Sequence, residues 1–340
     1  MRLTVLLVLA LGLMGGCDAA IDQPAPAPAT LGPEHLAVIV NDRDPLSREI
    51  VDYYVARRRI PAANVIHVQF PPGGSVMRVQ DFLPLRAEVL RQTPATVQAY
   101  ALAWTTPYRV GCMSITTAMA AGFRKEFCAI GCKPTAASPY FDSDSHRPFD
   151  DFGWRPSILL AGTTLAAVKS LIDRGVAADG THPAGDGFLM VTSDRARNAR
   201  ARFYQGILLL QSDRFRLHLL QQNSLKDRKD VLFYFTGLAT VPDIDTNTFL
   251  PGAIADHLTS AGGQLTDSRQ MSSLRWLEAG ATGSYGSVTE PCNYVQKFPR
   301  PNIVINRYLN GETLLEAYWK SVQWPGQGVF IGEPLASPFH

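Results

Sequence analysis

The chain has 340 residues, which is enough to bury one large hydrophobic core or two. Its 32 basic and 30 acidic residues give a net charge of +2, which excludes a strongly basic nucleic-acid-binding protein. The hydrophobic content of 46% is ordinary for a globular protein, and no apolar run after the N-terminus is long enough to span a bilayer. We therefore expect a folded globular protein without a nucleic-acid partner.

The first 17 residues are typical of an export signal. Arg2 gives a positive start, residues 3–14 are apolar, and Leu13-Met-Gly-Gly-Cys17 resembles a bacterial lipobox, which predicts diacylation of Cys17. The acyl chains would anchor the protein to the lipid bilayer without a spanning helix. Asp18 resembles an inner-membrane retention signal, so the expected location is the periplasmic face of that membrane. The alternative is ordinary signal-peptide cleavage nearby, which would give a soluble periplasmic protein.

After a Pro/Ala-rich linker at 18–33, apolar strands alternate with helices. This alternation predicts an α/β fold with a mostly parallel sheet flanked by helices. We divide it into an N-terminal half, 34–150, and a C-terminal half, 151–340, which could also form one compact unit. Strands are predicted at 36–40, 65–70, 97–104, 157–160, 187–191, 231–235, 303–305 and 329–331, and helices at 44–59, 82–92, 112–123, 163–178 and 309–322.

Residues 249–295 form a central block that combines a double glycine, a Ser/Thr/Gly-rich turn region, one histidine and one cysteine. Pro251 and Gly252 favour the start of a helix, Gly262-Gly263 favours its end, and apolar residues between them recur every three or four positions. His257 lies at the edge of that apolar stripe. Asp256 next to it cannot orient the His257 ring, because adjacent helical residues point about 100° apart.

Two groups of residues are candidates for a site. The first is Tyr108 and Arg109, which follow the strand 97–104, because ligands in open α/β sheets bind beyond strand ends. The second is a Cys292/His257 pair, with a thiolate as nucleophile and an imidazole as base. The candidate binding residues around this pair are Asp256, Ser284 and Tyr285 in a Gly-rich turn region, and Glu290.

The cysteines offer a competing explanation for Cys292. Four remain after Cys17, and in an oxidising compartment they predict two disulfides with three possible connectivities among Cys112, Cys128, Cys132 and Cys292. A four-cysteine zinc site is the rival interpretation, but the spacing has no CxxC pair, so no metal is predicted. If both disulfides form, Cys292 is not a free nucleophile.

Two charged segments have solvated surfaces as their default interpretation. The acidic region 142–151 begins Asp-Ser-Asp-Ser and is faintly like a calcium loop, but it lacks the sixth-position Gly and the closing Glu. The four arginines in 195–202 could bind anions, although such a run is usually an exposed helix face. The chain contains no GxGxxG, P-loop, GxSxG or HExxH motif, and no cofactor is predicted.

Several phrases together resemble a family of exported bacterial proteins of unknown function, found in genomes with the exosortase, or PEP-CTERM, sorting system. The resemblance covers nearly the whole mature chain and implies an exported protein of that context, without a known activity. The phrases are Gly111-Cys-Met-Ser-Ile-Thr-Thr117, Leu171-Ile-Asp-Arg-Gly175, Gly252-Ala-Ile-Ala-Asp-His-Leu-Thr-Ser260, Gln270-Met-Ser272, Gly280-Ala-Thr-Gly-Ser-Tyr-Gly286, Glu290-Pro-Cys292, Lys297-Phe-Pro299, Glu316-Ala-Tyr-Trp-Lys-Ser-Val322 and Gly326-Gln-Gly-Val-Phe-Ile-Gly-Glu-Pro-Leu335.

The order of Gly262-Gly263, Gly280-Ala-Thr282, a late helix and Gly332-Glu-Pro334 is also remotely similar to gingipain-like cysteine peptidases of the caspase-like fold. Those peptidases place His-Gly after one strand and the nucleophilic Cys after the next. Here the strand 231–235 ends in Thr236-Gly237 and the strand 187–191 ends in Thr192-Ser193. The resemblance therefore implies a caspase-like fold without its dyad at the expected strand ends.

Two hypotheses follow. The first is a non-catalytic or accessory envelope domain that binds a peptide or a surface polymer. The second is a cysteine hydrolase or transpeptidase that uses Cys292 and His257.

Overall fold

The computed structural model describes residues 30–210 and 215–340. The predicted signal peptide, the lipidated Cys17, Asp18 and the linker up to residue 29 lie outside the described residues. Within the described residues no helix is both long enough and apolar enough to cross a membrane.

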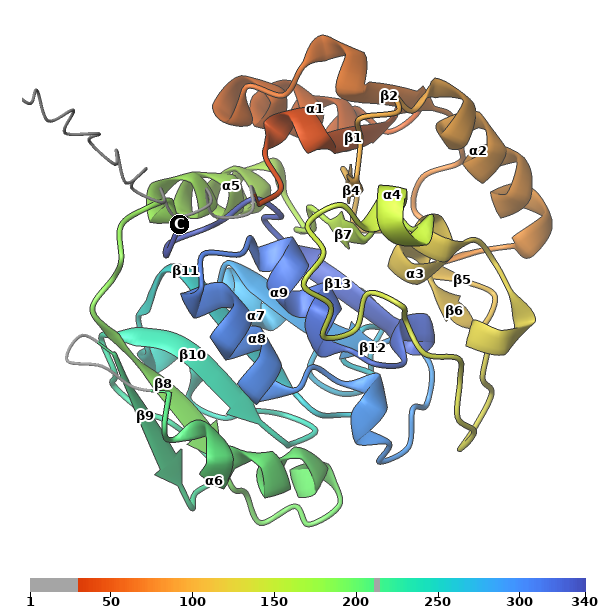
Figure 1. The fold of residues 1–340 in the computed structure, drawn as a ribbon. Helices are drawn as coiled ribbons and strands as arrows, with labels where there is room; N and C mark the ends of the chain where they lie inside the picture. The colour runs from red at the N-terminus through yellow and green to blue at the C-terminus, as the bar shows by residue number, and fades with distance from the viewer. Residues whose placement is uncertain (1–29, 211–214) are drawn as a thin grey trace, which may run out of the picture.

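A ten-stranded sheet runs through the molecule (Figure 1), in the order β2-β1-β4-β7-β13-β12-β11-β10-β8-β9. All neighbouring strands of this sheet are parallel except β12 and β13, which are antiparallel. This pair joins two groups of parallel strands that run in opposite directions. A small sheet, β3-β5-β6, lies apart from it. The strands are β1 (Leu36–Asn41), β2 (Val65–Val68), β3 (Val76–Met77), β4 (Ala99–Leu102), β5 (Arg109–Val110), β6 (Met113–Ser114), β7 (Ser157–Leu159), β8 (Gly185–Met190), β9 (Phe215–Leu220), β10 (Val231–Thr236), β11 (Phe249–His257), β12 (Gly283–Ser287) and β13 (Gly328–Gly332).

Helices cover both faces of the sheet, which confirms the predicted α/β class with a mostly parallel, helix-flanked sheet. Helices α8 and α9 pack against each other in front of the sheet in Figure 1, and α1 packs against α5. The helices are α1 (Pro45–Arg58), α2 (Val79–Gln92), α3 (Ile115–Ala121), α4 (Pro148–Phe152), α5 (Leu165–Ala178), α6 (Tyr204–Ile207), α7 (Leu274–Glu278), α8 (Pro301–Leu309) and α9 (Leu314–Ser321).

Local capping signals set the starts of α1 and α9, and the sequence predicts the first of these starts correctly. Asp44 caps α1 by accepting a hydrogen bond from the Leu46 amide at 3.0 Å, and Pro45 occupies the first turn. Thr313 and Glu316 form a reciprocal capping box at the start of α9. The start of α9 therefore lies five residues beyond the predicted residue 309.

The predicted helix that opens at Pro251 is wrong, because residues 249–257 form strand β11. Residues 252–257 of β11 are all buried, and a fully buried parallel strand carries a run of small and apolar residues instead of strict alternation. Such a run also fits a helical stripe over a short length. The predicted strand at 303–305 is wrong in the opposite sense: it lies in α8, which begins at Pro301, and its β-branched residues pack into the core.

The sheet passes without a break through both predicted halves of the chain. Strand β4 of the N-terminal half pairs with β7 of the C-terminal half, and β7 pairs in turn with β13, so the two halves share one sheet. A buried contact crosses the same boundary, because the Tyr54 hydroxyl of α1 donates to Glu333 after β13 at 2.7 Å. Arg58 of α1 forms an ion pair with the same carboxylate.

Candidate functional site

The loops that follow β4, β11 and β12 meet at one place. The Tyr108 hydroxyl donates a hydrogen bond to Asp267, and the Ser75 hydroxyl donates to the same carboxylate at 3.1 Å. Arg109 Nη1 and Gln264 Nε2 donate to the Val288 carbonyl at 3.4 and 3.3 Å. The structure thus brings the predicted residues Tyr108 and Arg109 beside the loops of the central block. Burial raises the pKa of Tyr108 to about 12, so this phenol stays protonated and acts as a donor.

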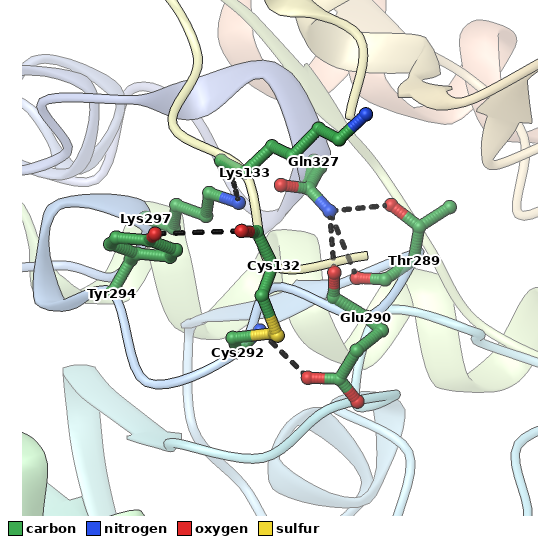
Figure 2. The surroundings of a disulfide bond; sticks show 8 residues. All are labelled: Cys132, Lys133, Thr289, Glu290, Cys292, Tyr294, Lys297 and Gln327. Atoms are coloured by element: carbon green, nitrogen blue, oxygen red, sulfur yellow. Dashed lines mark hydrogen bonds between the residues drawn. A yellow bond between two sulfur atoms is a disulfide. The ribbon is translucent and has the colours of Figure 1, made fainter. Parts of the chain in front are cut away.

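Cys292 is oxidised. It forms a disulfide with Cys132 across a sequence separation of 160 residues (Figure 2), and Cys112 pairs with Cys128. Both predicted disulfides are therefore present, and the structure selects one of the three connectivities. Glu290 Oε1 accepts a hydrogen bond from the Cys292 amide at 2.7 Å, so this candidate binding residue holds the turn that carries the disulfide.

His257 is fully buried at the end of β11, and both of its ring nitrogens have partners. Nδ1 accepts a hydrogen bond from Trp276 Nε1 at 2.9 Å, which leaves the proton on Nε2, 3.0 Å from the Met271 carbonyl. Burial lowers the pKa of His257 to about 4, so the ring is neutral at physiological pH. The structure does not assemble the predicted Cys292/His257 dyad, because the sulfur is bonded to Cys132 and neither ring nitrogen is free to take a proton from a thiol.

Asp256 points to the opposite face of the sheet from His257, since consecutive strand residues alternate. Its Oδ1 lies 2.6 Å from Arg200 Nη2, and both side chains are almost completely buried. Burial raises the pKa of Asp256, and the guanidinium opposes that change. Arg200 also donates to the Thr236 carbonyl at 2.9 Å, so this pair fixes the end of β10. Asp256 is therefore a core residue and does not orient His257.

The arginine-rich segment is only in part the exposed face that the sequence predicted. Arg195 and Arg202 are exposed, but Arg200 is 1% exposed and belongs to the core. Arg197 is partly buried and bridges Asp194 and Thr259, at 2.7 and 3.1 Å. A sequence-based charge count cannot separate these cases, because the carboxylate that pairs with Arg200 lies 56 positions further along the chain.

Ser284 and Tyr285, predicted to bind a ligand, are buried in β12 instead. The Tyr285 hydroxyl donates to the Lys297 carbonyl at 2.5 Å, and burial raises its pKa. Their Gly-rich segment is a strand inside the sheet because its glycines admit close neighbours: a Cβ at Gly283 would lie 2.6 Å from Leu314 Cδ1. Neither residue reaches a ligand at the surface.

Strands β10 and β11 end beside each other in the sheet. These strands are parallel neighbours, and Thr236 is directly beside His257 in the register. The other neighbour of β10 is β8, which overlaps the predicted strand 187–191 and is followed by Thr192-Ser193. The end of β10 offers Thr236-Gly237, and His257 is followed by Leu258 and Thr259. A cysteine is absent from both strand ends.

A groove that the sequence analysis missed lies between β3 and α2. Its volume is about 840 Å³, and it opens next to the Tyr108 contact, since Pro107 lines it. The sequence signal was the Pro-Pro-Gly-Gly run at 71–74, which marks only a turn. The apolar side chains that line the groove are Val68, Phe70, Pro71, Pro72, Val76, Met77, Pro84, Leu85 and Pro107.

The described residues include no group of three or more His, Cys, Asp or Glu side chains that could hold a metal ion. In the acidic region 142–151, Asp142 and Asp144 pair with Arg307, and His146 contacts Glu316 at 2.7 Å. These carboxylates are therefore ion-paired with the C-terminal half and do not form a calcium loop.

No protein-family model matches the chain, and no curated protein matches it. A solved structure described as "Structure of Protease" is similar at a TM-score of 0.45 and 9% sequence identity, over 90% of this chain and 78% of that chain. A likeness this distant does not indicate an activity. The resemblance to exosortase-associated proteins stays a prediction.

Proposed function

We propose that this protein is an exported binding domain of the cell envelope that holds an extended peptide segment without cleaving it. The observation that carries the proposal is the apolar groove beside β3. This strand pairs only with β5 among the described residues, so one of its sides is an edge. An extended peptide can add to such an edge through backbone hydrogen bonds while its side chains enter the groove.

The chemistry of the groove favours a peptide over a surface polysaccharide. Val76 in the lining is 39% exposed, and the apolar lining is aliphatic and proline-rich apart from Phe70, which is buried. Such a lining suits apolar peptide side chains. Sugar rings are typically bound on exposed aromatic faces, but the large apolar side chains exposed in the described part of the chain are aliphatic. We therefore choose the peptide as the occupant.

The sulfur and imidazole chemistry supports binding without hydrolysis. A cysteine hydrolase needs a thiolate and a base within hydrogen-bond reach of it. All four cysteines of the described residues are in disulfides. His257 is neutral, buried and already hydrogen-bonded at both nitrogens.

The location and the biological context are part of the proposal. Disulfides are stable in oxidising compartments, which supports export to the periplasm. We propose that acylated Cys17 tethers the domain to the bilayer and that the peptide belongs to a protein handled by an exosortase-type sorting system. Both statements depend on the N-terminal sequence and on the family resemblance.

A random dodecapeptide display library tests the proposed function. Peptides selected on the full-length exported protein should bind Val76→Asp about tenfold more weakly, because a charge enters the groove wall. The matched control is Leu90→Asp, at an equally exposed α2 residue that does not line the groove; it should bind as the wild type does. Selected peptides should also stay intact by mass spectrometry after incubation.

Two results would contradict the proposal. Cleavage of a selected peptide would restore the hydrolase hypothesis. Equal loss of affinity in both variants, or no enriched peptides, would exclude the groove as the binding site.

A further inference from the structure

Residues 128–132 form a five-residue loop with a disulfide at each end, which we call the pinned loop. Cys128 is bonded to Cys112 in the turn between β5 and β6, and Cys132 is bonded to Cys292 in the loop after β12. The two disulfides thus tie the loop to segments from both halves of the chain. At its tip Ile130 is 82% exposed.

The surroundings of the pinned loop hold it further. Lys297 Nζ donates to the Lys133 carbonyl at 2.6 Å, and the Tyr294 hydroxyl donates to the Cys132 carbonyl at 3.5 Å (Figure 2). Within the loop itself, the side chain of Ala129 is buried. An isoleucine this exposed gains nothing from the fold itself, although the fold fixes the backbone beneath it.

We propose that the pinned loop is a recognition element that inserts Ile130 into an apolar pocket of a partner protein with an acidic rim. Binding to a loop that is already ordered avoids the entropy cost of fixing it, and one buried anchor can carry much of an interface. The acidic rim follows from Lys125 and Lys133, which flank the loop, are exposed, and have no ion-pair partner within the described residues.

A bilayer is the less favoured occupant of this surface. Membrane insertion depends on total buried apolar area, and one aliphatic side chain supplies little of it. A shape-specific pocket, in contrast, gains from a rigid loop. This inference concerns a surface separate from the groove and does not depend on it.

The first test is photocrosslinking in living cells with benzoyl-phenylalanine at position 130 of the full-length protein, and at position 90 as the control. We expect an adduct with one protein at 130 that is absent at 90, identified by mass spectrometry. Lipid adducts only, the same adducts at both positions, or no adduct would overturn the proposal.

The second test uses that partner in purified form. Ile130→Asp should weaken binding about 10- to 100-fold, the ratio expected for losing one buried aliphatic side chain. Ile130→Leu should stay within about threefold, and Lys133→Glu should weaken binding more at low salt than at high salt. Unchanged affinity in Ile130→Asp would overturn the proposal, as would wild-type binding to phosphatidylglycerol vesicles that Ile130→Asp abolishes.

Discussion

The neutral, buried state of His257 makes a quantitative prediction about stability and pH. A group whose pKa falls on folding contributes stability that is complete above its unfolded pKa and is lost as the pH falls towards its folded pKa. For His257 these values are 6.5 and about 4. At ~1.4 kcal/mol per pKa unit the full loss is ~3 kcal/mol, of which about 2 kcal/mol is lost by pH 5.

The assay is urea denaturation of wild type and His257→Gln between pH 7 and 5. The glutamine amide can still donate to the Met271 carbonyl but does not titrate in this range. We expect the wild type to be the more stable protein at pH 7, and this advantage to shrink by about 2 kcal/mol at pH 5. Tyr308→Phe is the control, because it removes a buried hydrogen bond to the Gly252 carbonyl without removing a group that titrates there.

Parallel curves for wild type and His257→Gln would refute the reasoning, since they would mean that the imidazole titrates as it does in the unfolded chain. Such a ring would be available as a general base near neutral pH, and the hydrolase hypothesis would regain support. A structural role for His257 would be supported if the free energy of unfolding of His257→Gln approaches that of the wild type as the pH falls, while that of Tyr308→Phe stays parallel to the wild type.

Three further predictions follow from individual contacts. Iodoacetamide should leave Cys292 unmodified in the exported protein until a reductant is added; labelling before reduction, detected by mass spectrometry, would contradict the disulfide. Asp256→Asn should lower the free energy of unfolding by about 3–5 kcal/mol in urea titrations, because it leaves Arg200 charged and unpaired in the core. Replacing both residues with apolar ones should recover most of that loss, and an additive double variant would argue against a coupled pair. Tyr108→Phe and Asp267→Asn should each cost about 1 kcal/mol, and the double variant should cost little more than either one, unless the contact is absent in solution.

Residues of the central block, 249–295, make two connections to the N-terminal half of the chain. The Cys132–Cys292 bond removes the sulfur that the hydrolase hypothesis needs, and it also fixes the loop that presents Ile130. The contact between Tyr108 and Asp267 ties the groove side of the N-terminal half to the loop after β11. The block is therefore a structural junction, and the surfaces available to ligands lie beside it.

Whether a segment forms a helix or a strand was predictable wherever its apolar residues recur with one clear spacing and its ends carry capping or turn residues. Helix α1 begins at the Asp44-Pro45 cap and α5 carries an apolar stripe, and both needed only neighbours in the sequence. Strands β1, β4 and β10 were predictable as short apolar runs. Segment 249–257 was not, because a buried strand with Pro, Gly and Ala fits either period, and pairing with β10 and β12 decides between them.

The amino-acid sequence by itself determined the α/β class, the expected disulfide number and the absence of the common catalytic motifs. These follow from composition, periodicity and residue counts, which are local or additive properties. Only the tertiary structure decided which cysteines pair, that Arg200 is buried against Asp256, and that His257 faces Trp276 while Cys292 is bonded elsewhere. Each of these depends on contacts between residues that are 16 to 160 positions apart. Such pairing is set by how the strands align in the sheet rather than by any signal within one segment.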